Sequence, residues 1–482
     1  MEIIKLEKVN EVYNKVICEP GVGYEIKDYF TFKVPNYQFM PAYKNKLWDG
    51  NIYLFNPMNC LLYGGLTEQL EIFCKSRDYK LELLSDFSSD NMSVKETLDF
   101  VKSLNLPFQP RDYQLEAFVR CVRSRRKMLL SPTGSGKSLI IYLLSRFYNL
   151  RTLIIVPTTS LIHQMASDFL SYGYSDPDNI HKIYQGQDKN IKSQFVISTW
   201  QSIFKQSKDW FNQFDVVIGD EAHLFKAKSL TSIMTKLETC KYRFGFTGTL
   251  DGSETHQLVL EGLFGPVKKI ITTSELIEQK HLSNFMIKCI SLQYPDDIKK
   301  ECSKYSFQQE MDFLVSNQER NKFITNLSLS LKGNTLLLFQ YVDKHGKVLY
   351  DMISNEHSDK DIYFVHGGID GNEREKIRNI VEKNNNSIII ASYGTFSTGI
   401  NIKNLHNIIF SSPSKSKVRN LQSIGRGLRL SDNKEQAVLY DISDDLSWKE
   451  RKNFTLLHYI ERVKIYNEEQ FEYKTYKINI NT

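Results

Sequence analysis

The sequence predicts an α/β protein, with two tandem parallel-sheet lobes preceded by a small α+β domain. Two observations predict the lobes. From about residue 92 onward, short β-branched or leucine-rich segments alternate with helical patterns, an alternation typical of parallel sheets covered on both faces. One such segment also runs directly into a glycine-rich loop and an apolar helix, at residues 129–144. The preceding segment differs, because aromatic residues and turn signals crowd it.

The first domain is expected to span residues 1–91 and to select the substrate. Its aromatic residues lie among prolines and glycines, which predicts short strands with tight connections and one helix near residues 67–75. Packing in the domain core is the favoured interpretation for most of these rings. Lys44, Lys46 and Trp48 are the exception, because cations beside a ring can bind exposed bases by stacking and charge.

The first lobe is expected to span residues 92–273, and it begins with a capping box at Ser93 and Glu96. Strands are predicted near residues 128, 153, 195, 216 and 244. The strand near residue 128 leads through Ser131 into a loop that consists of Pro132, Thr133, Gly134, Ser135, Gly136, Lys137 and Ser138.

This loop has the composition of a phosphate-binding turn. Small residues let backbone N–H groups point inward at a polyphosphate, and the helix that follows directs its positive dipole end at the same place. Lys137 would neutralise the β- and γ-phosphate oxygens, and the Ser138 hydroxyl would help to hold Mg²⁺. A plain Gly/Ser turn between a strand and a helix is the alternative interpretation.

Two adjacent carboxylates, Asp220 and Glu221, follow the predicted strand near residue 216. Ligands of open α/β sheets bind at the carboxyl ends of the strands. We therefore expect Asp220 to hold Mg²⁺ and Glu221 to orient or deprotonate the attacking water. A solvated acidic pair at a strand end is the alternative, and the phosphate loop in the same lobe makes it the less favoured one.

The second half of the chain repeats the alternation. Residues 274–331 are expected to form a helical, charged bridge that belongs with the second lobe, and residues 332–447 to form that lobe. A closing helix and a strand-like tail are expected in residues 448–482.

Arg426 and Arg429 stand three residues apart on a predicted helix, so both can face one cleft. Phosphoryl transfer needs cations where charge develops on the phosphate oxygens, and an arginine finger raises the rate by roughly three to five orders of magnitude. An exposed basic surface is the alternative, but the spacing from Gln422 through Arg426 to Arg429 favours the catalytic role.

In their order, these segments resemble the motifs of superfamily 2 helicases and translocases with the DEAH form of motif II, over about residues 108–429. The resemblance implies two RecA-like lobes that must close on ATP for hydrolysis. It also implies residue roles: Arg111, Gln114, Gly399 and Asn401 in ATP binding, Pro157, Thr158, Thr199, Ser392 and Thr395 in contacts with nucleic acid, His223, Thr247 and Thr249 in coupling, and Gln422, Arg426 and Arg429 in catalysis.

The resemblance implies an ATP-dependent helicase that uses Mg²⁺. The layout of the chain is most similar to that of recombination helicases, which implies a helicase that unwinds or branch-migrates branched DNA and RNA–DNA hybrids in recombination, fork regression and repair. Single-stranded DNA is expected as a further binding partner. An RNA helicase of RNA metabolism and a nucleic-acid-stimulated ATPase subunit without unwinding activity are the alternatives. Contacts to the phosphate backbone carry no sequence information, so binding should be sequence-independent and salt-dependent.

Composition limits the protein class. The 482 residues carry a net charge of +6, which fits a polyanionic partner, and 7 scattered cysteines without Cys-x-x-Cys spacing indicate reduced thiols and no zinc site. The chain shows no apolar run of the roughly twenty residues that a membrane helix needs. We expect a monomer in the cytoplasm, which is that of the host cell if the chain is of phage origin.

Overall fold

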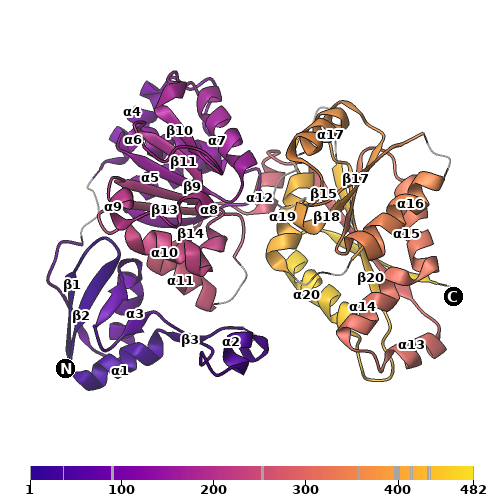
Figure 1. Ribbon diagram of the computed structural model, residues 1–482, viewed down its shortest axis with the longest axis horizontal. Coiled ribbons are helices and arrows are strands. Elements are labelled where there is room, and N and C mark those ends of the chain that lie inside the picture. Colours follow the sequence, from indigo (N-terminus) through magenta and orange to yellow (C-terminus); the bar gives the residue numbers. More distant parts are fainter. Residues whose placement is uncertain are drawn as a thin grey trace. The chain divides into compact units, whose positions relative to one another are not determined.

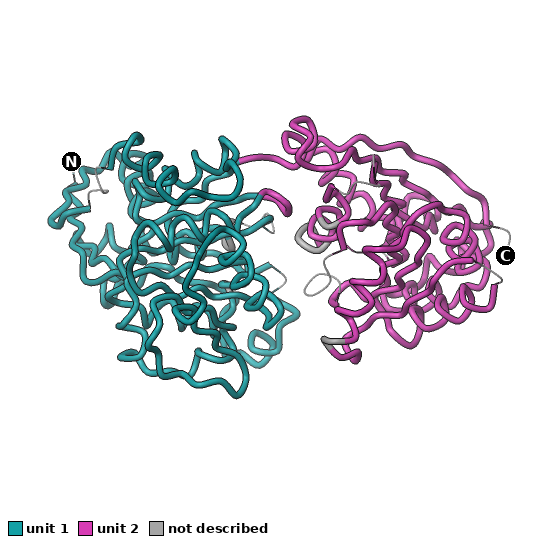
Figure 2. Tube along the Cα trace, turned by 90° about the horizontal axis from the view of Figure 1, so that it is seen from above, with its two compact units in different colours: residues 1–131, 136–270 teal, residues 132–135, 271–482 magenta. Residues whose placement is uncertain are grey.

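Two seven-stranded parallel sheets and one five-stranded mixed sheet organise the described part of the chain (Figure 1). The computed structural model describes residues 2–35, 37–87, 92–250, 254–356, 359–395, 402–412, 414, 416–430, 434 and 436–480, without the side chains of residues 226, 254–256, 371, 372, 417–419 and 426. The chain divides into two units, residues 1–131 with 136–270 and residues 132–135 with 271–482 (Figure 2).

The first domain is a mixed sheet with helices. Its sheet has the order β5-β6-β2-β1-β7, in which β1 pairs antiparallel with β2 and parallel with β7. A separate two-stranded ribbon of β3 and β4 carries η1 and α2 (Figure 1). The elements are β1 (Ile3–Lys8), β2 (Tyr13–Ile17), α1 (Pro20–Tyr29), β3 (Thr31–Lys33), η1 (Tyr37–Phe39), α2 (Pro41–Lys44), β4 (Asn51–Tyr53), β5 (Phe55–Asn56), β6 (Leu61–Tyr63), η2 (Gly64–Leu66), α3 (Thr67–Ser76) and β7 (Lys80–Leu83).

This domain packs directly on the first lobe, because buried residues of both form one hydrophobic cluster. The closest approach is at Gly65, where a Cβ atom would stand 1.9 Å from the backbone oxygen of Glu261. At Gly262 of the lobe, a Cβ atom would meet the Tyr63 side chain at 3.0 Å. Only glycine fits at Gly65, so this residue sets the distance between the two backbones.

The first lobe is a parallel sheet of order β10-β11-β9-β12-β13-β8-β14. Its strands β9 and β11 are buried at every position, as a sheet covered on both faces requires. The elements are α4 (Val94–Ser103), α5 (Asp112–Val122), β8 (Arg126–Leu130), α6 (Lys137–Tyr148), β9 (Thr152–Val156), α7 (Thr159–Ser171), η3 (Pro177–Asn179), β10 (Ile180–Ile183), β11 (Phe195–Thr199), α8 (Trp200–Ile203), α9 (Lys208–Phe211), β12 (Val216–Asp220), η4 (Ala222–Lys226), α10 (Lys228–Lys236), β13 (Tyr242–Thr247), α11 (Glu254–Phe264) and β14 (Val267–Lys269).

The second lobe is a parallel sheet of order β17-β18-β16-β19-β20-β15-β21. The elements are α12 (Thr273–Glu278), β15 (Asn284–Gln293), α13 (Asp296–Cys302), α14 (Phe307–Ser316), α15 (Gln318–Ser330), β16 (Thr335–Phe339), the π-helical turn η5 (Val342–Gly346), α16 (Lys347–Asn355), β17 (Asp361–Val365), α17 (Gly371–Lys383), β18 (Ser387–Ser392), β19 (Asn407–Phe410), α19 (Lys417–Gly427), β20 (Gln436–Asp445), α20 (Phe454–Glu468) and β21 (Tyr473–Asn479).

The fold class is confirmed, but the segment 274–331 is not a purely helical bridge. Within it, β15 is a ten-residue strand that pairs with β20 along its whole length. The tail strand β21 then pairs with β15, so the carboxyl-terminal segment completes the sheet of the second lobe. In this structure, no helix among the described residues is both long and apolar enough for a membrane crossing.

Candidate active site

The loop between β8 and α6 has the backbone that its glycines predict. Gly134 and Gly136 have φ angles of 85° and 80°, in the left-handed region that favours glycine. Gly136 is the N-cap of α6, so Lys137 and Ser138 stand in the first turn of that helix. The positive dipole end of a helix and the N–H groups of its first turn suit such a turn to an anion.

Side chains of the loop make local polar contacts. Lys137 Nζ donates to the backbone oxygen of Ser131 at 3.2 Å, and Ser135 Oγ donates to that of Pro132 at 2.7 Å. The hydroxyl groups of Ser138 and Tyr172 lie 2.7 Å apart. Burial raises the pKa of Tyr172 to about 12. Sequence reasoning missed Tyr172, because no local pattern links a tyrosine on the following helical segment to this serine.

Two further residues predicted to bind ATP, Arg111 and Gln114, stand at the start of α5, and Gln114 lies beside the loop. Gln114, in the first turn of α5, is buried, and its Oε1 accepts from the backbone N–H of Arg111 at 2.9 Å. A Cβ atom at Gly136 would stand 2.2 Å from Gln114 Nε2, so the glutamine amide packs against the loop backbone. Arg111 Nη1 donates to the Tyr113 hydroxyl at 2.8 Å.

The acidic pair stands at the carboxyl end of β12. Asp220 is the last residue of the strand, and Glu221 follows in the left-handed region with a φ of 50°. The Glu221 N–H donates to Asp220 Oδ1 at 3.0 Å. Burial and the Glu221 charge raise the pKa of Asp220 to about 6, while the Lys137 charge opposes this shift. The lysine and the aspartate are thus close enough to interact.

These donors fit Mg²⁺, which takes oxygen ligands from one or two protein groups and completes its shell with water and phosphate. The half-buried carboxylate of Asp220 and the Ser138 hydroxyl supply such oxygens. Within the described residues, no cluster of three or more His, Cys, Asp or Glu side chains forms a closed metal site.

The three predicted coupling residues lie together. His223 Nδ1 is 3.0 Å from Thr247 Oγ1 and 3.3 Å from Glu221 Oε2. Thr247 ends β13, the neighbour of β12, and its Oγ1 donates to the backbone oxygen of Thr249 at 3.0 Å. Glu221 is thereby connected through one histidine to the end of the adjacent strand.

The predicted nucleic-acid contacts of each lobe follow strand ends. Pro157 and Thr158 follow β9, and Thr199 ends the adjacent parallel strand β11. The Thr199 side chain is 6% exposed and its Oγ1 lies 2.9 Å from Ser202 Oγ. In the second lobe, Ser392 ends β18 and its Oγ donates to Thr395 Oγ1 at 2.8 Å.

In the first domain, the tip of the β3–β4 ribbon carries the predicted base-contacting residues. Lys44 and Lys46 are exposed, and Leu47 is 80% exposed between them and Trp48. Trp48 is half-buried and its Nε1 donates to the backbone oxygen of Asn51 at 2.8 Å, so the indole also braces the ribbon.

The motif of the arginine finger lies on α19 and just beyond it. Gln422 and Arg426 belong to the helix, whereas Arg429 lies two residues past its last residue, Gly427, contrary to the predicted shared helix face. The buried Lys434 side chain donates to the Gly427 carbonyl at 2.8 Å and caps the helix there. The Arg426 side chain and the residues Gly399 and Asn401 lie outside the described residues.

Two RecA-like parallel-sheet lobes, a phosphate loop and an acidic pair at the end of a neighbouring strand define a superfamily 2 motor ATPase. Family models match residues 4–84 (DNA helicase UvsW, N-terminal), 107–252 (Type III restriction enzyme, res subunit) and 319–431 (Helicase conserved C-terminal domain).

The ATP-dependent DNA helicase uvsW of Enterobacteria phage T4 is 35% identical over 493 residues, which cover 97% of each chain. The crystal structure of T4 UvsW covers 99% of both chains at 33% identity and a TM-score of 0.52. The chain belongs to the UvsW family of ATP-dependent DNA helicases. A fragment of an HsdR subunit from Vibrio vulnificus, at 17% identity and a TM-score of 0.58, shares the fold.

Proposed function

We propose that this chain is an ATP-dependent DNA helicase that unwinds or branch-migrates branched DNA in recombination, replication fork regression and repair. The observation that carries the proposal is the Asp220–Glu221–His223 cluster at the end of β12, where the Lys137 charge of the phosphate loop acts on Asp220, in a chain that matches T4 UvsW over 97% of its length. Single-stranded DNA and RNA–DNA hybrids are further proposed substrates, and we propose a monomer that acts in the host cytoplasm.

ATP would be held mainly by the loop from Pro132 to Ser138. Backbone N–H groups and the α6 dipole would bind the phosphates, Lys137 would neutralise their oxygens, and Arg111 with Gln114 would contact the base. When bound by Ser138 and Asp220, Mg²⁺ would offset charge on the phosphate oxygens. Gly399 and Asn401 are proposed as further ATP contacts.

Hydrolysis would begin with a water that Glu221 orients for attack on the γ-phosphorus. Gln422, Arg426 and Arg429 would stabilise the transition state, in which charge spreads over the phosphate oxygens. The contact between His223 and Thr247 supports a coupling role, because it connects the catalytic glutamate to the strand end that leads to Thr249.

Nucleic acid would be gripped through its backbone. Pro157, Thr158, Thr199, Ser392 and Thr395 are proposed contacts, and their position at strand ends supports the proposal. Because Thr199 and Thr395 are nearly buried, their backbone groups are the better candidates for phosphate binding. Substrate choice would come from Lys44, Lys46 and Trp48 in the first domain.

The deciding experiment compares ATP hydrolysis by the full chain with branched DNA, single-stranded DNA and RNA, alongside strand separation on the same substrates. We expect branched DNA to stimulate best and to be unwound. Strong stimulation by RNA alone would favour an RNA helicase, and hydrolysis without strand separation would favour an ATPase subunit. Lys137→Ala should lower hydrolysis at least a hundredfold on every substrate.

A further inference from the structure

Two buried arginines hold the connection between β19 and α19 in the second lobe. Arg320 comes from α15 and Arg462 from α20, and both side chains are almost fully buried. Each pairs with an aspartate of β20 and also donates to a backbone carbonyl of this connection. Removing a charged guanidinium group from water costs free energy. Two such groups around one segment therefore need a structural or functional reason.

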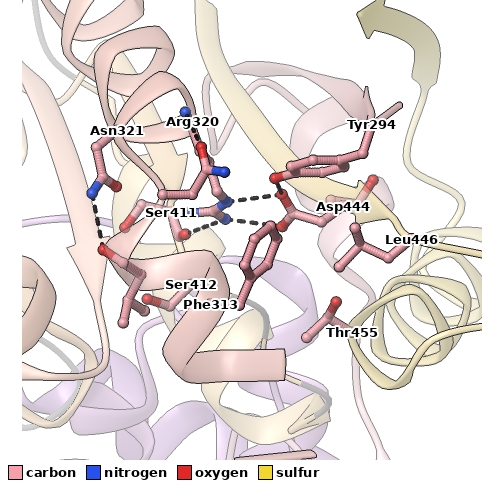
Figure 3. Close-up of polar contacts among 12 residues, drawn as sticks. Tyr294, Phe313, Arg320, Asn321, Ser411, Ser412, Asp444, Leu446 and Thr455 are labelled. Carbon is pink, nitrogen blue, oxygen red and sulfur yellow. Dashed lines mark hydrogen bonds and ion pairs between the residues drawn. The ribbon is translucent and has the colours of Figure 1, made fainter. Parts of the chain in front are cut away.

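The first of these arginines makes a planar set of contacts (Figure 3). Arg320 Nε and Nη2 donate to the two carboxylate oxygens of Asp444 at 2.8 and 3.0 Å. Nη2 also donates to the backbone oxygen of Ser411 at 2.8 Å. The Tyr294 hydroxyl donates to the same carboxylate at 2.7 Å, so the aspartate is held from two sides.

The second arginine repeats this arrangement with different residues. Arg462 Nε and Nη2 donate to the Asp441 carboxylate, with Nη2 at 2.7 Å from Oδ1. Its Nη1 donates to the backbone oxygen of Ser414 at 3.1 Å, and the Tyr466 hydroxyl donates to Asp441 Oδ2 at 2.8 Å.

The two arginine–aspartate pairs approach the connection from opposite faces of the sheet. Asp441 and Asp444 are three residues apart on β20, and alternate residues of a strand point to opposite faces. In keeping with this, α15 and α20 lie on different sides of the sheet in Figure 1. The backbone oxygens of Ser411 and Ser414 thus accept hydrogen bonds from arginines on opposite faces of the sheet.

Residues of this connection also bond to the turn after β18 and to α19. The Tyr393 hydroxyl, beside Ser392, donates to the backbone oxygen of Ser412 at 3.1 Å. At the other end, Asn420 of α19 donates its side-chain amide to the backbone oxygen of Ser414 at 3.2 Å. The position of this segment therefore sets both the turn after β18 and the start of the helix that carries Gln422 and Arg426.

Stability alone does not explain such pairs, because replacing a buried ion pair by apolar residues of similar volume is often neutral or stabilising. What apolar residues cannot supply is a directed hydrogen bond to a chosen carbonyl. The arrangement occurs twice. Around each arginine it comprises an aspartate, a tyrosine hydroxyl and a backbone carbonyl.

We propose that Arg320 and Arg462 are positioning residues for ATP hydrolysis. They fix the backbone carbonyls of Ser411 and Ser414, and these carbonyls in turn place two elements: the helix α19, which carries Gln422 and Arg426, and the turn from Ser392 to Thr395. This inference rests on the proposed function, because it assumes that Gln422 and Arg426 of α19 act in catalysis. The carboxyl-terminal segment, through Arg462, is then part of the motor.

The test replaces each pair by apolar residues, as Arg320→Met with Asp444→Leu and as Arg462→Met with Asp441→Leu, in the full chain. We expect cooperative unfolding and a KM for ATP within about threefold of wild type, but a DNA-stimulated kcat at least tenfold lower. The matched control removes an exposed pair of the same lobe, Lys344→Met with Asp312→Leu, and should leave kcat unchanged. Folded double variants with a kcat within twofold of wild type would overturn the proposal.

Lysine variants keep the test decisive if an apolar pair does not fold. Arg320→Lys and Arg462→Lys retain the charge, but one ammonium group cannot reproduce the bidentate pairing and the carbonyl bond together. We expect these folded variants to lose kcat, and an unchanged kcat overturns the proposal. A wild-type chain without DNA-stimulated hydrolysis would instead contradict the proposed function itself, so the two failures are distinguishable.

Discussion

Arg126, the first residue of β8, bonds to Glu11 of the first domain: its Nη2 lies 3.0 Å from the Glu11 carboxylate and also donates to the Glu11 backbone oxygen. Both side chains are largely buried. Since β8 leads straight into the phosphate loop, the first domain is attached to the strand that positions ATP. The attachment is reinforced by Gly65, whose backbone meets that of Glu261.

Gly65→Ala should detach the first domain from the lobe. The added Cβ atom would stand 1.9 Å from a backbone oxygen, which cannot move aside as a side chain could. We expect residues 4–84 to become sensitive to limited proteolysis and the chain to lose about 2–4 kcal/mol of stability, as in severe overpacking. Gly21→Ala is the matched control, because nothing lies within 4 Å of its added Cβ atom. Equal proteolysis of the two variants would contradict this interpretation of the contact.

Thr247→Val should separate hydrolysis from unwinding. The substitution keeps the shape of the side chain but removes the hydroxyl that contacts His223 and the Thr249 carbonyl. We expect DNA-stimulated hydrolysis within about fivefold of wild type and unwinding at least tenfold slower, measured on one branched substrate. Thr235→Val, which removes a hydroxyl that donates to the carbonyl of Ser232, serves as the control. A proportional loss of both activities would argue against a coupling role.

Local patterns predicted most of the two sheets and the phosphate loop. The loop follows from residues that are neighbours in sequence, and strands such as β9 and β12 consist mainly of apolar residues. The strand β15 was missed because its partners, β20 and β21, lie far along the chain, and its polar and apolar residues stand beside charged helical segments.

The missed parts of the site share one physical cause, which is contact between residues remote in sequence. Arg320 meets Asp444 only after β20 is placed beside β19, and Tyr172 meets Ser138 only after α7 has packed on α6. Arg429 is a local exception, because it lies past the end of α19, which Lys434 caps at Gly427. None of these contacts leaves a spacing that a sequence pattern can detect.

The exposed ribbon tip gives a prediction about salt. Lys44 and Lys46 are exposed beside Leu47, and each phosphate contact contributes about 0.9 to the slope of log binding constant against log salt on duplex DNA. The double variant Lys44→Ala with Lys46→Ala should therefore lower that slope by about 1.8 on a branched substrate. Lys75→Ala, which removes an exposed lysine of α3 paired with Glu71 of the same helix, should leave the slope unchanged. An unchanged slope in the double variant would exclude both lysines from the phosphate contacts.

His345 gives a prediction about acid stability. Its ring is buried, with Nδ1 3.1 Å from Ser412 Oγ, and burial together with the Arg320 charge lowers its pKa to about 3 from the usual 6.5. The unfolded chain binds a proton near pH 6.5, whereas the folded chain stays neutral at this residue until about pH 3. Acidification therefore favours the unfolded state: the contribution of His345 is fully present above pH 6.5 and is lost as the pH falls toward 3.

At pH 5 this difference in proton uptake corresponds to about 2 kcal/mol of lost stability. His345→Asn keeps a group that can bond to Ser412 Oγ but removes the titration, so it should lose less stability than wild type on acidification. We expect the variant to be less stable than wild type at pH 7.5, because it leaves a cavity, and the gap to narrow by about 2 kcal/mol at pH 5. Urea unfolding followed by circular dichroism at the two pH values measures the gap. A gap of equal size at both values would show that the histidine accepts a proton in the folded state, in which case its environment is more open to water than its burial beside Arg320 indicates.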